Sequence, residues 1–209
     1  MATTHDPRST DAQRRARLIG AQGPRRLRWT SDQFYRLGQR GFFRDKRVEL
    51  IKGNIILTSP ISPVHAAAVE LLDRALRIAF GPGHRFRVQQ PIDLGKRAQP
   101  EPDIVVMPGD PRDNLSGHPT TALLIAEISD TSLRFDRRVK ARLYAQAGLT
   151  DYWIVNLVDR QVEIHRNPKP VVDRQGRSSY QDITIVSASG SVQPLAAPGA
   201  TIAVADLLP

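Results

Sequence analysis

Residues 125–156 carry the sequence IAEISDTSLRFDRRVKARLYAQAGLTDYWIVN, which predicts a strand, a helix and a second strand in succession. The runs 122–126 and 152–155 are wholly apolar, which is typical of strands buried on both faces of a sheet. Between them, apolar spacing predicts a helix over 136–147 that Gly148 closes. This segment therefore forms the centre of a sheet with a helix packed on it.

Further helices and strands are predicted on both sides of this segment by capping residues, turn residues and apolar periodicity. They are a helix from Thr30–Asp32 to Gly41, a hairpin over 47–59 with a Lys52-Gly53 turn, a helix from Ser62-Pro63 to Gly81, and strands at 85–94, 104–107, 162–165 and 180–187. The order of these elements predicts an α/β (α+β) domain with a mixed central sheet flanked by helices.

The composition is that of a globular protein, with 209 residues, 40% hydrophobic and 24% charged. A chain of this length buries a sizeable core without disulfide or zinc staples. There are no cysteines, which excludes disulfides, thiolate catalysis and cysteine-ligated metals. Any metal must therefore be held by oxygen or nitrogen ligands.

Positive charge is concentrated at the N-terminus. Residues 1–28 contain seven arginines against Asp6 and Asp11, a net of +5, whereas the other 181 residues carry 23 bases and 19 acids, a net of +4. We interpret 1–28 as a disordered basic arm and 29–209 as the folded domain. Such an arm suits a polyanionic partner such as DNA, although the 25 arginines also fit a compositional bias.

Neither export nor a membrane location is expected from the sequence. The first 20 residues lack the apolar core of a signal peptide. The uncharged stretch 183–205 is interrupted by prolines and glycines, which break a lipid-exposed helix. We therefore expect a cytoplasmic protein whose residues 183–205 form turns and short strands.

Two acids stand next to apolar strands. Asp103 begins the run IVVM and Glu127 ends the run ALLIA, and a carboxylate in such a place is costly unless it is paired or bound to a cation. If the two strands are neighbours, both carboxylates can converge on one hard cation such as Mg²⁺. The alternative is that each acid caps a loop or pairs with an arginine.

The helix after Glu127 offers a basic group to this pair of acids. Arg137, Lys140 and Tyr144 have the spacing of one helical face, and an amine from that face could orient an attacking water or neutralise charge on a phosphorane. The alternative is a solvated lysine. The neighbouring bases Arg134, Arg137 and Arg138 are candidates for phosphate contacts, or else form a solvated face.

The chain from about Thr30 onward, about 180 residues, resembles the Uma-two family of restriction-endonuclease-like proteins in the PD-(D/E)XK nuclease superfamily. The resemblance rests on five segments in order. They are VELIKGNII, SPISPVH, PEPDIVV, the 125–156 stretch quoted above and VEIHR. It implies a restriction-endonuclease-like core.

The resemblance also implies roles for individual residues. Asp103 and Glu127 become ligands of Mg²⁺ or Mn²⁺, joined by the backbone carbonyl of Ile128. The superfamily's usual lysine, two residues after the second acid, is replaced by Ser129, and the family supplies Lys140 from the next helix instead. Two further residues match family segments: Glu49, an acid facing the same site, and His65, a phosphate contact or auxiliary base.

These observations predict a metal-dependent endonuclease that hydrolyses phosphodiester bonds of DNA. The expected catalytic residues are Glu49, Asp103, Glu127 and Lys140, and a homodimer is expected from the superfamily. Two alternatives stay open at this stage. One is a catalytically inactive nucleic-acid-binding or interaction module of the same fold, and the other is a structural protein whose acids pair with its arginines.

Overall fold

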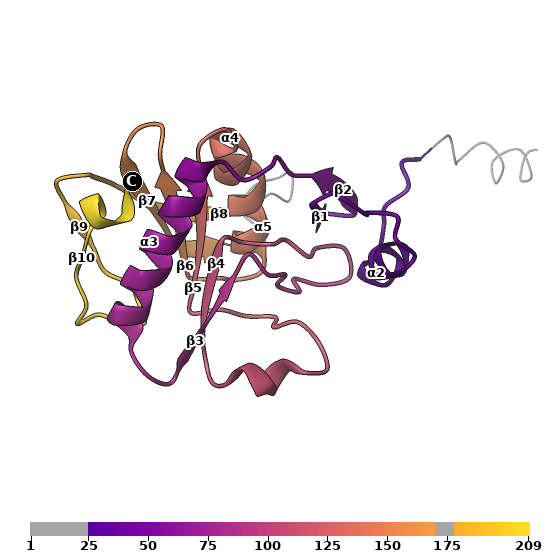
Figure 1. Cartoon of the computed structure of the whole chain (residues 1–209), viewed down its shortest axis with the longest axis horizontal. Coiled ribbons are helices and arrows are strands. Elements are labelled where there is room, and N and C mark those ends of the chain that lie inside the picture. The colour runs from indigo at the N-terminus through magenta and orange to yellow at the C-terminus, as the bar shows by residue number, and fades with distance from the viewer. Residues whose placement is uncertain (1–24, 170–177) are drawn as a thin grey trace, which may run out of the picture.

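A computed structural model describes residues 25–169 and 178–209, so residues 1–24 of the predicted basic arm lie outside the described residues (Figure 1). Its centre is a six-stranded sheet with the strand order β3-β4-β5-β6-β7-β8. The strands are β3 (His84–Val88), β4 (Ile104–Pro108), β5 (Leu124–Ser129), β6 (Asp151–Asn156), β7 (Gln161–Lys169) and β8 (Ser179–Ser187). Only β5 and β6 run parallel, which confirms the predicted mixed sheet.

The helical crossover between β5 and β6 is the segment that the sequence predicted. It consists of α4 (Leu133–Phe135), a π-helical turn (Asp136–Lys140) and α5 (Ala141–Gln146). Parallel neighbours require such a crossover. The helix begins three residues before the predicted position 136, and the π-helical turn was not foreseen, because apolar periodicity does not distinguish it from an α-helix.

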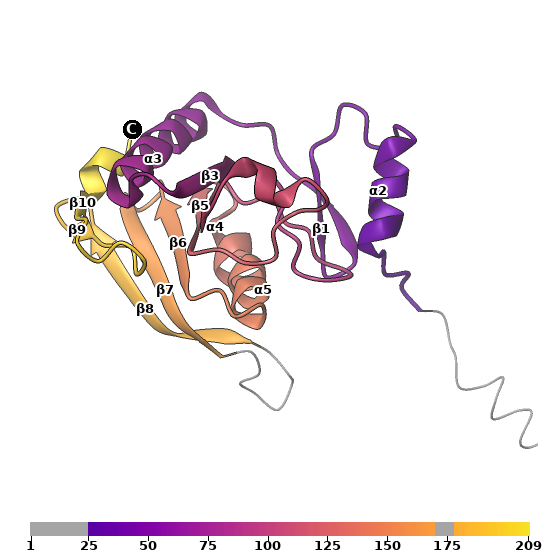
Figure 2. The same cartoon turned by 90° about the horizontal axis from the view of Figure 1, so that it is seen from below.

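Helices cover both faces of the sheet (Figures 1 and 2). On one face, α3 (Pro63–Phe80) and the C-terminal segment bury a core that includes Leu72, Leu76 and Trp153. On the other face, α5 buries Tyr144 against Ile125 and other apolar side chains of the sheet. Because side chains alternate along β5, Glu127 has the same orientation as Ile125 and faces the α5 layer.

A smaller lobe stands beside the sheet (Figure 2). It contains α2 (Ser31–Gln39) and the hairpin of β1 (Val48–Ile51) and β2 (Asn54–Leu57), as predicted. Lys52 and Gly53 both have positive φ, 50° and 75°, the conformation of a two-residue hairpin turn. The hairpin is attached to the main body by an antiparallel bridge between Leu50 and Gln99.

One predicted strand differs in detail, whereas the stretch 183–205 has the turns and short strands that were predicted. The strand expected over 85–94 ends at Val88, because Gln89 adopts a φ of 51° and turns the chain away from the sheet. The stretch 183–205 contains the end of β8 and the short strands β9 (Ser191–Val192) and β10 (Ile202–Ala203). In the described ranges 25–169 and 178–209, no helix has the length and apolarity needed to cross a membrane.

Candidate active site

A pocket of about 450 Å³ lies where the β1–β2 hairpin, the start of α3 and the β5–α4 connection meet. The four residues predicted to be catalytic line it, from four separate parts of the chain. They are Glu49, Asp103, Glu127 and Lys140. Antiparallel pairing of β4 with β5 brings the second and third of these together, since Ile104 lies opposite Ala126.

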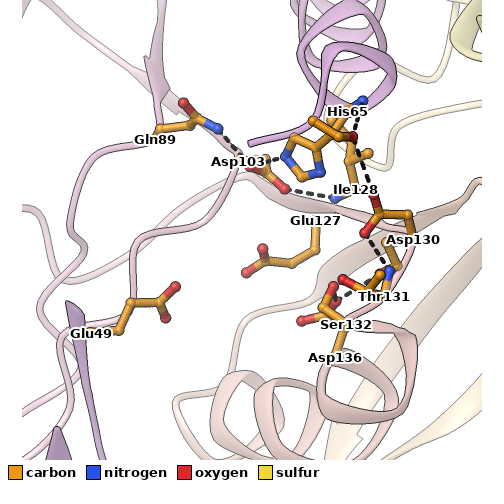
Figure 3. A network of polar contacts seen from close by, with 12 residues as sticks. Glu49, His65, Gln89, Asp103, Glu127, Ile128, Asp130, Thr131, Ser132 and Asp136 are labelled. Atoms are coloured by element: carbon orange, nitrogen blue, oxygen red, sulfur yellow. Dashed lines mark hydrogen bonds and ion pairs between the residues drawn. The ribbon is translucent and has the colours of Figure 1, made fainter. Parts of the chain in front are cut away.

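Lys140 links two of the acids. Its Nζ lies 2.9 Å from Oε1 of Glu127 and 3.2 Å from Oε1 of Glu49, and all three side chains are at least nine-tenths buried. Figure 3 shows the Glu49 and Glu127 side chains pointing toward one another, the former from the hairpin and the latter from β5. Glu49 is therefore a buried member of this pocket and not an exposed strand residue.

The charge states of this group follow from burial and mutual attraction. Burial lowers the pKa of Lys140, but Glu127 and then Glu49 raise it more, so the net shift is upward and the amine is an ammonium at neutral pH. Burial is also the largest cause that raises the pKa of Glu127 well above 4.5, opposed by Lys140. The Tyr144 hydroxyl adds a 2.6 Å hydrogen bond to Oε1 of Glu127.

Asp103 accepts three hydrogen bonds (Figure 3). Oδ1 accepts from His65 Nε2 at 3.0 Å and from Gln89 Nε2 at 3.1 Å, and Oδ2 accepts from the backbone N–H of Ile128 at 2.8 Å. Burial raises the pKa of Asp103, but the bond from His65 and the others outweigh it, so the carboxyl stays ionised. The same hydrogen bond raises the pKa of His65.

Asp136 is a further buried acid in this pocket. Its Oδ2 accepts hydrogen bonds from Ser129 Oγ at 2.7 Å and from Ser132 Oγ at 2.5 Å. Burial raises its pKa, although Lys140 and the two serines lower it. Ser129, two residues after Glu127, thus bonds an acid of the following helix.

The residue types in this pocket fit a hard divalent cation. Glu49 Oε2 is buried without a hydrogen-bond partner in the described part of the chain, so a carboxylate oxygen there is free for a ligand. Acids outnumber bases around it, with Glu101 and Asp136 beside the three acids already described. Within residues 25–169 and 178–209, however, no three acid or histidine side chains form a metal-ligand group by themselves. A cation would therefore need two carboxylates completed by backbone oxygen and water.

The arginines of the crossover helix are separated by the structure. All three arginines are exposed, but Arg137 also donates to Glu163 of β7 at 2.6–3.1 Å. The sequence predicted that Arg137 shares one helical face with Lys140 and Tyr144, and this prediction is wrong for Arg137. The π-helical turn adds a residue to that turn of the helix, so Arg137 faces β7 while Lys140 faces the pocket.

Several residues in the pocket or bonded to its acids were not found by sequence reasoning. Asp136 precedes Lys140 by four positions, a spacing that could have indicated it. Gln89, Glu101 and Arg47 lie in loops or at a strand start, and nothing in their local sequence indicates that the fold brings them here. Their positions depend on the hairpin lobe packing against the sheet.

Comparison with known proteins agrees with the fold. A crystal structure of a "putative nuclease belonging to DUF820" from Anabaena variabilis is similar, with a TM-score of 0.66 and 17% identity over 85% of this chain and 96% of that chain. The fold is thus that of a nuclease-like α+β protein. Residues 31–205 match the Uma2 family, described as "Putative restriction endonuclease", and the chain belongs to this family. No curated protein matches it.

Proposed function

We propose that this chain is a divalent-cation-dependent endonuclease that hydrolyses phosphodiester bonds of DNA. The observation that carries the proposal is the buried Lys140 amine, 2.9 Å from Glu127, in a pocket that also contains Asp103. An acid pair with an adjacent amine is what phosphodiester hydrolysis needs, because charge develops on the phosphoryl oxygens and on the leaving oxygen.

Asp103 and Glu127 would hold Mg²⁺ or Mn²⁺. When bound, the cation supplies positive charge that polarises a phosphoryl oxygen. His65, Gln89 and the Ile128 N–H keep Asp103 ionised and fix its orientation, so their contribution is to position a ligand. His65 itself lines the pocket.

Lys140 acts as a donor and not as a base, because its raised pKa keeps the proton on the amine. An ammonium at this position orients the nucleophile and offsets the charge that builds up in the transition state. Glu49 tethers the amine from the side opposite Glu127, at 3.2 Å. The lysine thereby has a fixed position although it comes from a helix and not from β5.

Basic residues at the pocket and around it would contact the DNA backbone. Arg134 and Arg138 are exposed at the crossover helix, and Arg47 lines the pocket. Arg137 is bound to Glu163, so a phosphate would have to compete with that carboxylate. Removing residues 1–27, which hold six arginines, should weaken binding and flatten its dependence on salt.

The test is nicking of supercoiled plasmid with Mg²⁺ or Mn²⁺. We expect activity in the natural chain, loss in Asp103→Asn and Lys140→Gln, and no loss in Lys46→Gln, an exposed lysine outside the pocket. Loss should reach at least about a hundredfold, the effect of removing one charge-stabilising group. Equal activity in all four proteins would identify a contaminating nuclease and overturn the proposal.

A second candidate is a catalytically inactive nucleic-acid-binding module of the same fold. The observation that favours it is that both oxygens of Asp103 already accept hydrogen bonds from the protein. This candidate predicts salt-sensitive DNA binding with no cleavage under any divalent cation, and binding that Lys140→Gln leaves unchanged.

A further inference from the structure

The two edges of the central sheet differ in how they are protected. At one edge, β3 is five residues long and carries Arg85 and Arg87. The Arg85 guanidinium donates to the Asp110 carbonyl at 2.8 Å and to the Asn114 side chain, so the loop after β4 covers this edge. Short strands, charges and covering loops are the features that stop edge-to-edge association.

Within residues 25–169 and 178–209, the opposite edge lacks these features. β8 has nine residues, SYQDITIVS, without proline, lysine or arginine, and among the described residues it pairs only with β7 (Figure 2). Ile183 and Ile185 are 56% and 59% exposed on it. They lie opposite His165 and Glu163 of β7, so both point to the same face of the sheet. A long, regular edge with exposed β-branched side chains favours pairing with another strand.

We propose that β8 pairs with β8 of a second copy of this chain, antiparallel and centred on Thr184, so that the two sheets become one of twelve strands. In that register Ile183 of each copy lies opposite Ile185 of the other, which places all four isoleucines in one patch. Cross-strand pairs of β-branched side chains stabilise antiparallel sheets. This inference does not depend on the proposed enzymatic activity.

The strand's own composition favours a second copy as the occupant. Asp182 is the only charged residue of β8. In the proposed register it lies opposite Val186, and the two Asp182 carboxylates are about 13 Å apart along the strands, so they do not repel strongly. A two-fold axis relates the two copies in this register, so each β8 strand makes the same contacts with the other. Two-fold symmetry is the common arrangement of homodimers.

Light scattering coupled to gel filtration tests the interface. The natural chain should elute at twice its mass of 23.2 kDa. The double variant I183K/I185K should elute as a monomer or dissociate at least about tenfold more readily, because lysines on an edge oppose pairing. The matched control Ile78→Lys changes an isoleucine that is 78% exposed on α3 and should stay dimeric.

Cysteine cross-linking tests the register and needs no destabilising charge. The natural sequence has no cysteine, so a single introduced one can bridge only two copies. Thr184→Cys lies on the proposed axis, within disulfide range of its counterpart, and should cross-link on mild oxidation. Gln181→Cys, opposite Ser187 of the other copy, should not.

Either experiment can overturn the proposal. A natural chain that is monomeric at all concentrations does so, as does a folded I183K/I185K variant that remains dimeric. If that variant does not fold, equal cross-linking of Thr184→Cys and Gln181→Cys overturns the proposal, because random collision would then explain both.

Discussion

The sharpest prediction concerns replacement of Lys140 by methionine, which keeps most of the side-chain volume and removes the charge. Lys140, Glu127 and Glu49 have side chains only 7%, 4% and 7% exposed. Removing one partner of a buried ion pair costs about 3–5 kcal/mol of unfolding free energy, because the other charge is left uncompensated. Here two carboxylates lose their common partner, so we expect the upper part of that range near neutral pH.

The loss should depend on pH. Burial already raises the pKa of Glu127, and without Lys140, which lowers it, the pKa must rise further. The folded variant then binds a proton at pH values where the unfolded chain, with a glutamate pKa near 4.5, does not. The unfolding free energy of the variant therefore falls as pH rises from 4.5 to the pKa of Glu127 in the folded state, by about 1.4 kcal/mol per pH unit for one proton. It is regained as pH falls back toward 4.5.

Urea unfolding followed by circular dichroism measures this at several pH values. Lys46→Met is the matched control at an exposed lysine, and it should change the unfolding free energy by less than about 0.5 kcal/mol. The double variant K140M/E127Q should be more stable than Lys140→Met alone. If Lys140→Met costs no more than the control at every pH, the amine is not buried between two carboxylates, and the reasoning on the site fails.

Three further predictions use thermal or urea unfolding. His65→Gln should lower the unfolding free energy by about 1–3 kcal/mol. The pair of His65 with Asp103 stabilises the fold above the lowered pKa of Asp103 and until pH rises through the raised pKa of His65. A deficit that stays equal at high pH would contradict this. Tyr144→Phe should cost about 1–2 kcal/mol, since Glu127 loses a donor at 2.6 Å, and an unchanged midpoint would refute the bond. Glu163→Gln should lower the unfolding free energy by about 1.5–3 kcal/mol. This difference should disappear as pH falls from 4.5 toward the lowered pKa of Glu163, about 2. The control Asp73→Asn, in an exposed helical pair, should cost about 0.5 kcal/mol or less.

The elements of the fold were largely predictable because their signals are local. The Ser62-Pro63 start and Gly81 end of α3, the Lys52-Gly53 turn and the apolar runs of β4, β5 and β6 all depend on residues a few positions apart. Capping, positive φ and side-chain alternation act over that range. The order of these elements predicted the mixed sheet, and the family segments added the restriction-endonuclease-like core.

The sequence by itself also determined which residues were candidates for chemistry, because carboxylates beside apolar strands are costly without a partner. Only the tertiary structure decided what those partners are. It brings Glu49 of the hairpin to the Lys140 amine across 91 positions of sequence, and it adds Asp136 to the pocket. It also turns Arg137 away to Glu163 through a π-helical turn. Such contacts depend on how separate elements pack against one another, and the local periodicity of the sequence does not report that packing.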